Sequence, residues 1–118
     1  MNRRNKGFDG EERAAAYLES QGFRIIARNF RFTGGEIDII AQHDDTLVFI
    51  EVKAWTSFGI ENLEYALNNQ KQARIIKTAK FFLATHREYN SMALRFDVLF
   101  IGKESIHHLA SAFMERVL

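Results

Sequence analysis

The chain has 118 residues, of which 47% are hydrophobic and 26% charged, and its formal net charge is +1. This composition predicts a single globular domain spanning residues 1–118, and it excludes nucleic-acid binding through overall charge, so such binding would need a local patch. The chain contains no cysteine, which excludes a disulfide scaffold and a thiolate metal site.

The first residues form no apolar stretch long enough for a signal peptide, and no later segment is apolar enough to span a bilayer. We therefore expect a cytoplasmic protein without a membrane partner. A basic arm covers residues 1–6. After it, Asp9 and Glu12 have the spacing of a capping box and predict the start of a helix. This helix presents Glu11 on its apolar face and ends at Gly22.

Three strands follow, predicted at 23–32, 35–42 and 47–53. A loop at 56–60 leads to a helical region from about Glu61 that breaks at Asn68-Asn69. Asn69 and Gln72 predict a second capping box, which opens a helix with an apolar stripe. Strands at 94–101 and 105–110 complete the order α-β-β-β-α-β-β. This order predicts an α/β fold, with a mixed sheet flanked by helices.

The hairpin formed by the second and third strands, GGEIDIIAQHDDTLVFIEVKAW, carries four charged residues inside apolar strands. A four-residue turn at 43–46 pairs Gln42 with Leu47, and the same register opposes Asp38 to Glu51 and Glu36 to Lys53. One face is then entirely apolar; it consists of Ile37, Ile39, Ala41, Val48, Ile50 and Val52. The charges gather at one end of the other face.

Two opposed carboxylates cannot comfortably both stay ionised unless a cation neutralises them. Mg²⁺ or Mn²⁺ suits Asp38 and Glu51, because such ions take carboxylate oxygens together with waters. Lys53 lies on the same face and would orient or deprotonate a water. Glu11 would complete the acidic cluster. The alternative is a ladder of cross-strand ion pairs on a solvated sheet face.

Asp38 followed by Glu51-Val52-Lys53 looks like the active-site signature of the PD-(D/E)XK nuclease superfamily. A longer ordered set resembles the YraN-like family of predicted bacterial endonucleases, which is similar to archaeal Holliday junction resolvases. That set consists of Gly10-Glu11 before Ala14 and Tyr17-Leu18, Asn29-Phe30-Arg31, Gly35-Glu36-Ile37-Asp38, Phe49-Ile50-Glu51-Val52-Lys53 and Arg95-Phe96-Asp97. The resemblance implies a restriction-endonuclease-like core and a metal-dependent endonuclease acting on DNA, including branched or flapped DNA.

In this interpretation Asp38 and Glu51 hold the metal, and Glu11 assists directly or through a water. Lys53 orients the attacking water, while Glu36 holds Lys53 or supports the ligands. One position departs from the family pattern, because Trp55 replaces a basic residue two positions after the motif lysine. Tryptophan there would either stack on a base or cover an edge of the core.

Further residues are candidates for contacting nucleic acid. Arg28 and Arg31 would extend a basic patch, and Lys71 and Arg74, with Lys77, would form a phosphate-contacting ridge or a solvated helix face. Gln72 would approach the site or only cap its helix. Arg95 and Asp97 share a strand face and are interpreted as a structural pair, and the histidines show no metal spacing shared with the acids.

Two other function classes stay open. One is a non-catalytic nucleic-acid-binding module that keeps the nuclease fold. The other is a protein-interaction domain that uses exposed aromatic residues such as Phe58 and Phe81. A homodimer is compatible with each of them, since the sequence does not define the oligomeric state.

Overall fold

The computed structural model describes residues 4–54 and 67–114, and for residues 4–9 it describes the backbone alone. The elements are α1 (Arg4–Ser20), β1 (Arg24–Phe32), β2 (Gly35–His43), β3 (Thr46–Ala54), α3 (Asn69–Thr85), a 3-10 turn (Arg87–Tyr89), β4 (Ala93–Ile101) and β5 (Ile106–Phe113). The predicted α/β element order is confirmed over these residues. Trp55, Phe58, the loop 56–60 and the helical region from Glu61 lie outside them.

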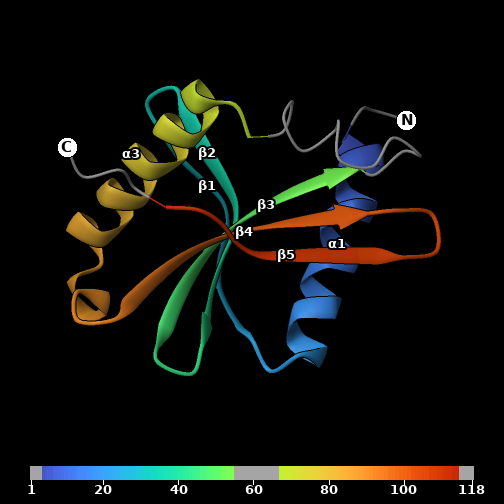
Figure 1. Ribbon diagram of the computed structural model, residues 1–118, viewed down its shortest axis with the longest axis horizontal. Helices are drawn as coiled ribbons and strands as arrows, with labels where there is room; N and C mark the ends of the chain where they lie inside the picture. Colours follow the sequence, from blue (N-terminus) through green and yellow to red (C-terminus); the bar gives the residue numbers. More distant parts are fainter. Residues whose placement is uncertain (1–3, 55–66, 115–118) are drawn as a thin grey trace.

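The strands form one five-stranded sheet in the order β1-β2-β3-β4-β5. Its neighbouring strands are antiparallel except for β3 and β4, which are parallel. A parallel pair requires a crossover connection, and α3 lies in this one. Figure 1 shows α1 and α3 on opposite sides of the sheet. This mixed sheet, with the two α-helices of the described residues, is compatible with a restriction-endonuclease-like core. Neither of the described helices is long and apolar enough to cross a membrane.

Each face of the sheet has its own apolar core. Ala14 and Leu18 of α1 pack with Ile39, Val48 and Ile50 on one face. The core on the other face contains Ile40, Leu47, Phe49, Ile75, Phe82 and Val98. Because successive residues of a strand point to opposite faces, a strand that feeds two cores is apolar almost throughout. The charged residues of β2 and β3 therefore stand out against a buried background.

The start of α1 differs from the prediction. The helix begins at Arg4, so Asp9 lies inside it and the capping box predicted at Asp9 and Glu12 is wrong. Residues 4–6 of the predicted basic arm therefore belong to the helix. The predicted end is confirmed: α1 stops at Ser20, and Gly22 adopts a φ of 90°, a left-handed conformation that favours glycine.

The start of α3 is one residue away from the predicted cap. Asn68, not Asn69, is the N-cap, and its side-chain oxygen accepts a 2.9 Å hydrogen bond from the Lys71 backbone N–H. The side-chain amide of Gln72 donates to the Leu67 carbonyl at 2.6 Å, and among the described residues no reciprocal capping-box bond to the Gln72 side-chain oxygen is seen. Where two asparagines are adjacent, residue type alone does not choose the cap.

A glycine lets α3 lie directly on β2. A Cβ atom built at Gly35 would lie 2.2 Å from Thr78 Oγ1 and 3.1 Å from the Arg74 carbonyl oxygen. Thr78 is buried, and its hydroxyl donates back to that carbonyl at 2.8 Å. Since a side chain at Gly35 would push the helix away, this contact holds the Arg74–Thr78 part of α3 close to the charged end of the hairpin.

Candidate active site: a carboxylate pair with two lysines

The predicted hairpin register is confirmed in its turn-proximal half. Gln42 pairs with Leu47, and the ladder continues to Ile39 and Ile50, where it stops. Asp38 and Glu51 are therefore not a backbone pair, and the predicted pairing of Glu36 with Lys53 does not form. The two strands separate at the charged residues, which opens the sheet there.

The Asp38 side chain takes the place of the missing ladder bond. Its Oδ2 accepts a 2.7 Å hydrogen bond from the Val52 backbone N–H. Ile37 belongs to the core under α3, whereas Ile39 belongs to the core under α1. Strict alternation would put both on one face, so the predicted apolar face is wrong at Ile37. The alternation is interrupted at Asp38, which directs its carboxylate toward β3.

Glu51 is the centre of the charged cluster. It is buried, and its Oε2 lies 2.6 Å from Lys71 Nζ and 3.3 Å from Lys53 Nζ. Lys53 follows on the same strand, while Lys71 reaches in from the first turn of α3. The helix predicted to carry a phosphate-contacting ridge thus supplies a cation to the site itself, a contact that the sequence pattern did not indicate.

The pKa of Asp38 is raised to about 8. Burial is the largest cause, and the neighbouring Glu51 carboxylate acts in the same direction, with a smaller contribution from the charge of Glu11. The Val52 N–H opposes them. Near neutral pH the pair thus retains a proton, which is the expected behaviour of two close carboxylates without sufficient positive charge.

The two lysines shift in opposite directions. Burial lowers the pKa of Lys53, and the adjacent Lys71 lowers it further against the attraction of Glu51. Burial also disfavours the charged form of Lys71, but its hydrogen bonds to Glu51 and Lys53 raise its pKa overall. The site thus holds one firmly charged lysine and one that loses its proton more easily, which is the property required of a general base.

The cluster faces a cavity of about 240 Å³ between the β1–β2 turn and α3. Its lining residues are Gly34, Gly35, Glu36, Asp38, Glu51, Lys71, Arg74 and Ile75. The predicted contact of Glu36 with Lys53 does not form; Glu36 instead accepts a 2.8 Å hydrogen bond from Arg31. Arg31 is therefore already paired, although its exposed side chain stays accessible.

Glu11 lies beside the pair without joining it. Its carboxylate is 3.9 Å from Arg28 Nη2, and Arg28 also binds Glu12 at 2.5 Å. These contacts to α1 neutralise Arg28, so the prediction that it extends a basic patch is not supported by its surroundings. Glu11 raises the pKa of Asp38 through its charge and is half-buried on the predicted face of α1.

The donor set of the pair fits a hard divalent ion. Mg²⁺ is commonly bound by one or two carboxylates together with waters and substrate oxygens, and a cation would relieve the charge repulsion that raises the pKa of Asp38. Among the described residues no three His, Asp or Glu side chains are placed to hold a metal ion. Asp38 and Glu51 would therefore be its protein ligands, without Glu11 as a direct third one.

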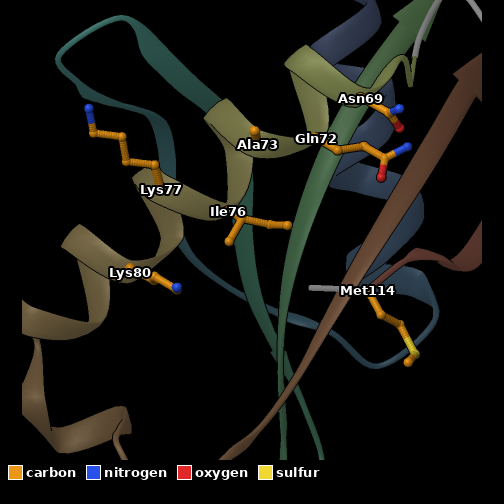
Figure 2. A pocket seen from close by; sticks show the side chains of 7 residues that line it. All are labelled: Asn69, Gln72, Ala73, Ile76, Lys77, Lys80 and Met114. Carbon is orange, nitrogen blue, oxygen red and sulfur yellow. The ribbon is translucent and has the colours of Figure 1, made fainter. Parts of the chain in front are cut away.

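Gln72 does not line the cavity that contains the pair. It lines a separate groove of about 510 Å³ along α3, together with Asn69, Ala73, Ile76, Lys77, Lys80 and Met114 (Figure 2). Over the residues that it describes, the structure shows no contact of Gln72 with the pair, and the Gln72 side-chain amide bonds to the Leu67 carbonyl. Of the predicted ridge, Arg74 is exposed and lines the cavity of the carboxylate pair, whereas the Lys77 ammonium lies 5.8 Å from the centre of the Phe32 ring.

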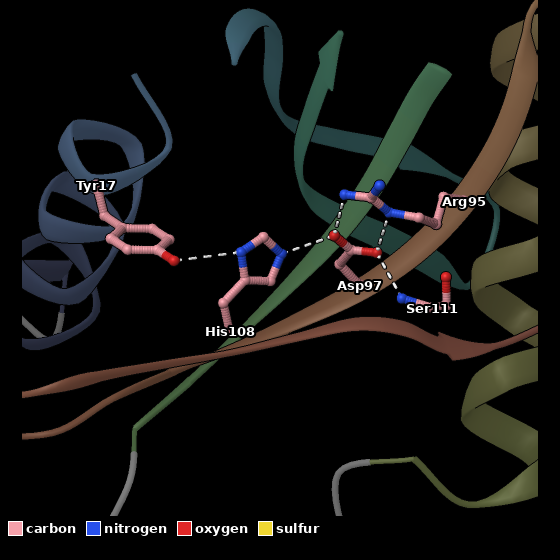
Figure 3. Close-up of polar contacts among 5 residues, drawn as sticks. All are labelled: Tyr17, Arg95, Asp97, His108 and Ser111. Carbon is pink, nitrogen blue, oxygen red and sulfur yellow. Dashed lines mark hydrogen bonds and ion pairs between the residues drawn. The ribbon is translucent and has the colours of Figure 1, made fainter. Parts of the chain in front are cut away.

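The predicted structural pair of Arg95 and Asp97 is confirmed, and it is part of a larger network (Figure 3). Arg95 donates two 2.9 Å hydrogen bonds to the buried Asp97 carboxylate, which also contacts His108 Nε2 at 2.7 Å and the Ser111 N–H at 2.9 Å. His108 Nδ1 is 3.4 Å from the Tyr17 hydroxyl. The network joins α1 to β4 and β5, and sequence reasoning identified only the Arg95–Asp97 part.

Phe81 is not an exposed anchor for a protein partner. Its ring stacks on Phe32 with centroids 3.9 Å apart, and the side chain is half-buried. The exposed large hydrophobic residues among those described are Leu94 and Met114. The interaction-domain hypothesis therefore loses one of its two named residues, while Phe58 is not described.

The fold and the site define a class: an α/β domain with a carboxylate–lysine cluster where two central strands separate. Residues 10–101 match the model of the Uncharacterised protein family UPF0102, and the chain belongs to this family. It is 45% identical over 126 residues to a UPF0102 protein of Treponema pallidum (strain Nichols), covering 99% of this chain and 100% of the relative. A UPF0102 protein of Persephonella marina is 42% identical over 108 residues, or 92% of each chain.

Proposed function

We propose that this protein is a metal-dependent nuclease that hydrolyses phosphodiester bonds in DNA. The observation that carries the proposal is the contact of Lys53 with Glu51, 3.3 Å apart, beside an Asp38 whose pKa is raised to about 8. Two carboxylates at one cavity, together with a lysine of lowered pKa in contact with Glu51, provide a cation site and a base for water. A structural ion-pair ladder would not require the strands to separate at these residues.

Each residue has a separate task in this reaction. Asp38 and Glu51 would hold Mg²⁺ or Mn²⁺, which when bound neutralises phosphate charge and makes water more acidic. Lys53 takes a proton from the attacking water as the new phosphorus–oxygen bond forms. The phosphorus–oxygen bond to the leaving strand then breaks, and solvent protonates the oxygen released. Glu11 supports the site from α1 by its charge or through a water.

The substrate side of the proposal rests on the basic residues at the cavity. Arg74 is exposed and lines the cavity, and Arg31 contacts Glu36, which also lines it. Both are placed to contact phosphate oxygens, the contacts that position DNA without reading its sequence. Branched or flapped DNA is included because of the resemblance to junction resolvases. A nuclease of this kind would work in the cytoplasm.

The test is a cleavage assay with linear, flapped and four-way DNA in Mn²⁺ and Mg²⁺. Lys53→Ala should lower the rate on the order of a hundredfold or more, since a positioned base is lost. Lys103→Ala, which removes an exposed lysine in the β4–β5 turn, is the matched control and should cleave like wild type. DNA binding without cleavage of any substrate would favour the non-catalytic nucleic-acid-binding module instead.

The metal can be tested without turnover. Because only the folded protein brings Asp38 and Glu51 together, Mn²⁺ at about a hundredfold above its dissociation constant should add about 2.7 kcal/mol to the free energy of unfolding. Asp38→Asn should abolish most of this gain, as measured by thermal unfolding with and without metal. A wild-type protein unaffected by millimolar Mn²⁺ would contradict the metal site.

A further inference from the structure

The Lys71 ammonium already occupies the position of a cation in the carboxylate site. Lys71 Nζ lies 2.6 Å from Glu51 Oε2, closer than Lys53 Nζ at 3.3 Å on the same oxygen. The Glu51 side chain is only 9% exposed and that of Lys71 26%, so water does little to screen this contact. One oxygen of a proposed metal ligand thus carries two ammonium groups.

A metal ion and both ammonium groups cannot share this oxygen. A magnesium–oxygen bond is about 2.1 Å, so the metal would lie within a few ångströms of each nitrogen, at distances where like charges repel strongly. Lys53 and Glu51 belong to the same strand, and the strand keeps them together. Lys71 comes from a different element, α3, so its side chain can leave Glu51 without any change in the strand.

We propose that Lys71 is the internal counter-ion of the metal-free site, and that a divalent metal displaces it from Glu51 toward the phosphate of the substrate. The inference rests on the proposed function and adds an active-site residue to it. Its destination is indicated by Arg74, which follows Lys71 by nearly one helical turn and lines the same cavity. Once displaced, Lys71 and Arg74 form a two-residue contact for one phosphate group.

This arrangement couples metal binding to substrate binding. While Lys71 is held by Glu51, it contributes little to phosphate binding, and the metal must compete with it. Metal binding releases the lysine, and a phosphate that holds the lysine in turn removes the competitor of the metal. By thermodynamic linkage each ligand then strengthens the binding of the other.

The first experiment measures Mn²⁺ binding by calorimetry in the absence of DNA. Lys71→Met removes the competing charge and keeps the length of the side chain, so Mn²⁺ should bind about tenfold tighter than to wild type. Lys71→Gln is the second variant, because its amide can still donate to Glu51 if loss of the contact impairs folding. Lys77→Met is the matched control, since Lys77 is on the same helix and lies over Phe32.

Equal or weaker Mn²⁺ binding in both folded Lys71 variants would overturn the inference and leave the metal site of the proposed function intact. No Mn²⁺ binding to wild type or to any variant would overturn both. Tighter binding in the Lys71 variants together with unchanged binding in Lys77→Met supports the inference, since it assigns the competition to one lysine of the helix.

The second experiment follows the displaced lysine. In a Lys53→Ala background, which removes the proposed base, the salt dependence of DNA affinity is measured with and without Mn²⁺. Lys71→Met should leave the slope unchanged without metal and reduce it by about one with metal, because the lysine contacts a phosphate only when released. The same slope change in both conditions would overturn the displacement.

Discussion

Asp38 of β2 and Asp97 of β4 are two versions of one local arrangement. Each accepts a backbone N–H from the neighbouring strand where the strand ladder is interrupted: Asp38 from Val52 at 2.7 Å, and Asp97 from Ser111 at 2.9 Å. Yet the pKa of Asp38 is raised to about 8, whereas that of Asp97 is lowered. The difference lies in what surrounds each carboxylate.

Burial raises the pKa of both groups, and their neighbours decide the result. Around Asp97, hydrogen bonds from His108, Arg95 and the Ser111 N–H outweigh burial and keep the carboxylate charged. Around Asp38 the charge of Glu51 adds to the effect of burial. A buried carboxylate with a full set of donors is a structural element, and one left short of positive charge is where a cation and chemistry are expected.

The largest expected effect is at the satisfied carboxylate. Asp97→Ala should lower the free energy of unfolding by about 3–5 kcal/mol, because it leaves the partly buried Arg95 guanidinium and the Ser111 N–H without their partner. Urea unfolding at pH 7 measures the loss. A change below about 1 kcal/mol would mean that the network contributes little to stability, and Asp97 could then not be contrasted with Asp38 as a structural residue.

The lowered pKa of Asp97 also sets a direction with pH. The contribution of Asp97 to the free energy of unfolding is fully present above its ordinary pKa of 3.8. It is lost as the pH falls through the lower pKa that Asp97 has in the folded protein. Wild type should therefore lose part of its stability advantage over Asp97→Ala in strong acid. An advantage that stays constant down to the acid-unfolding limit would contradict the shift.

Asp38→Asn should raise the free energy of unfolding, whereas Asp97→Ala should lower it. Between its ordinary pKa of 3.8 and about 8, the folded protein binds the Asp38 proton more tightly than the unfolded chain does. The free energy of unfolding contributed by this group therefore falls as the pH rises through that window. Asparagine resembles the protonated acid and does not titrate, so the variant should be more stable than wild type by about 1–3 kcal/mol at pH 8.

The measurement is urea unfolding of wild type and Asp38→Asn from pH 4 to pH 8, with a chelator present to exclude metal. The advantage of the variant should shrink toward pH 4, where wild-type Asp38 is protonated as well. Glu36→Gln changes a carboxylate at the same cavity that is already paired with Arg31, and should show no such gain. If Asp38→Asn were less stable than wild type at every pH, the ionised Asp38 carboxylate would not destabilise the folded protein, and the prediction would be contradicted.

The sequence predicted the α/β fold and the candidate residues for a clear reason. Two-residue periodicity fixes which strand residues face each other near a tight turn, and Gln42 and Leu47 are indeed paired. The same reasoning failed at Asp38, because periodicity assumes an unbroken ladder. A side chain that replaces a ladder bond breaks that assumption without leaving a mark in the pattern of apolar residues.

The sequence also could not predict which side chains from distant elements contact each other. Lys71 has the appearance of any lysine in the first turn of a helix, and its contact with Glu51 depends on how closely α3 approaches β2 at Gly35. His108 likewise gives no sign in the sequence that it meets Asp97 and Tyr17. Helical spacing predicts which residues share a face but not what that face contacts.

The smallest expected effect tests whether the two regions are independent. Tyr17→Phe removes a 3.4 Å contact to His108, a long hydrogen bond, and keeps the ring that lies 5.7 Å from the imidazole centre. The loss in free energy of unfolding should be about 0.5 kcal/mol, at the low end for a hydrogen bond.

Because Tyr17 lies on α1, which also carries Glu11, a shift of that helix would change the electrostatic effect of Glu11 on Asp38. We expect the pH dependence of stability between pH 4 and 8 to match that of wild type. A flattened curve would instead mean that the Asp97 network positions Glu11, and the structural and chemical aspartates would then be coupled through α1.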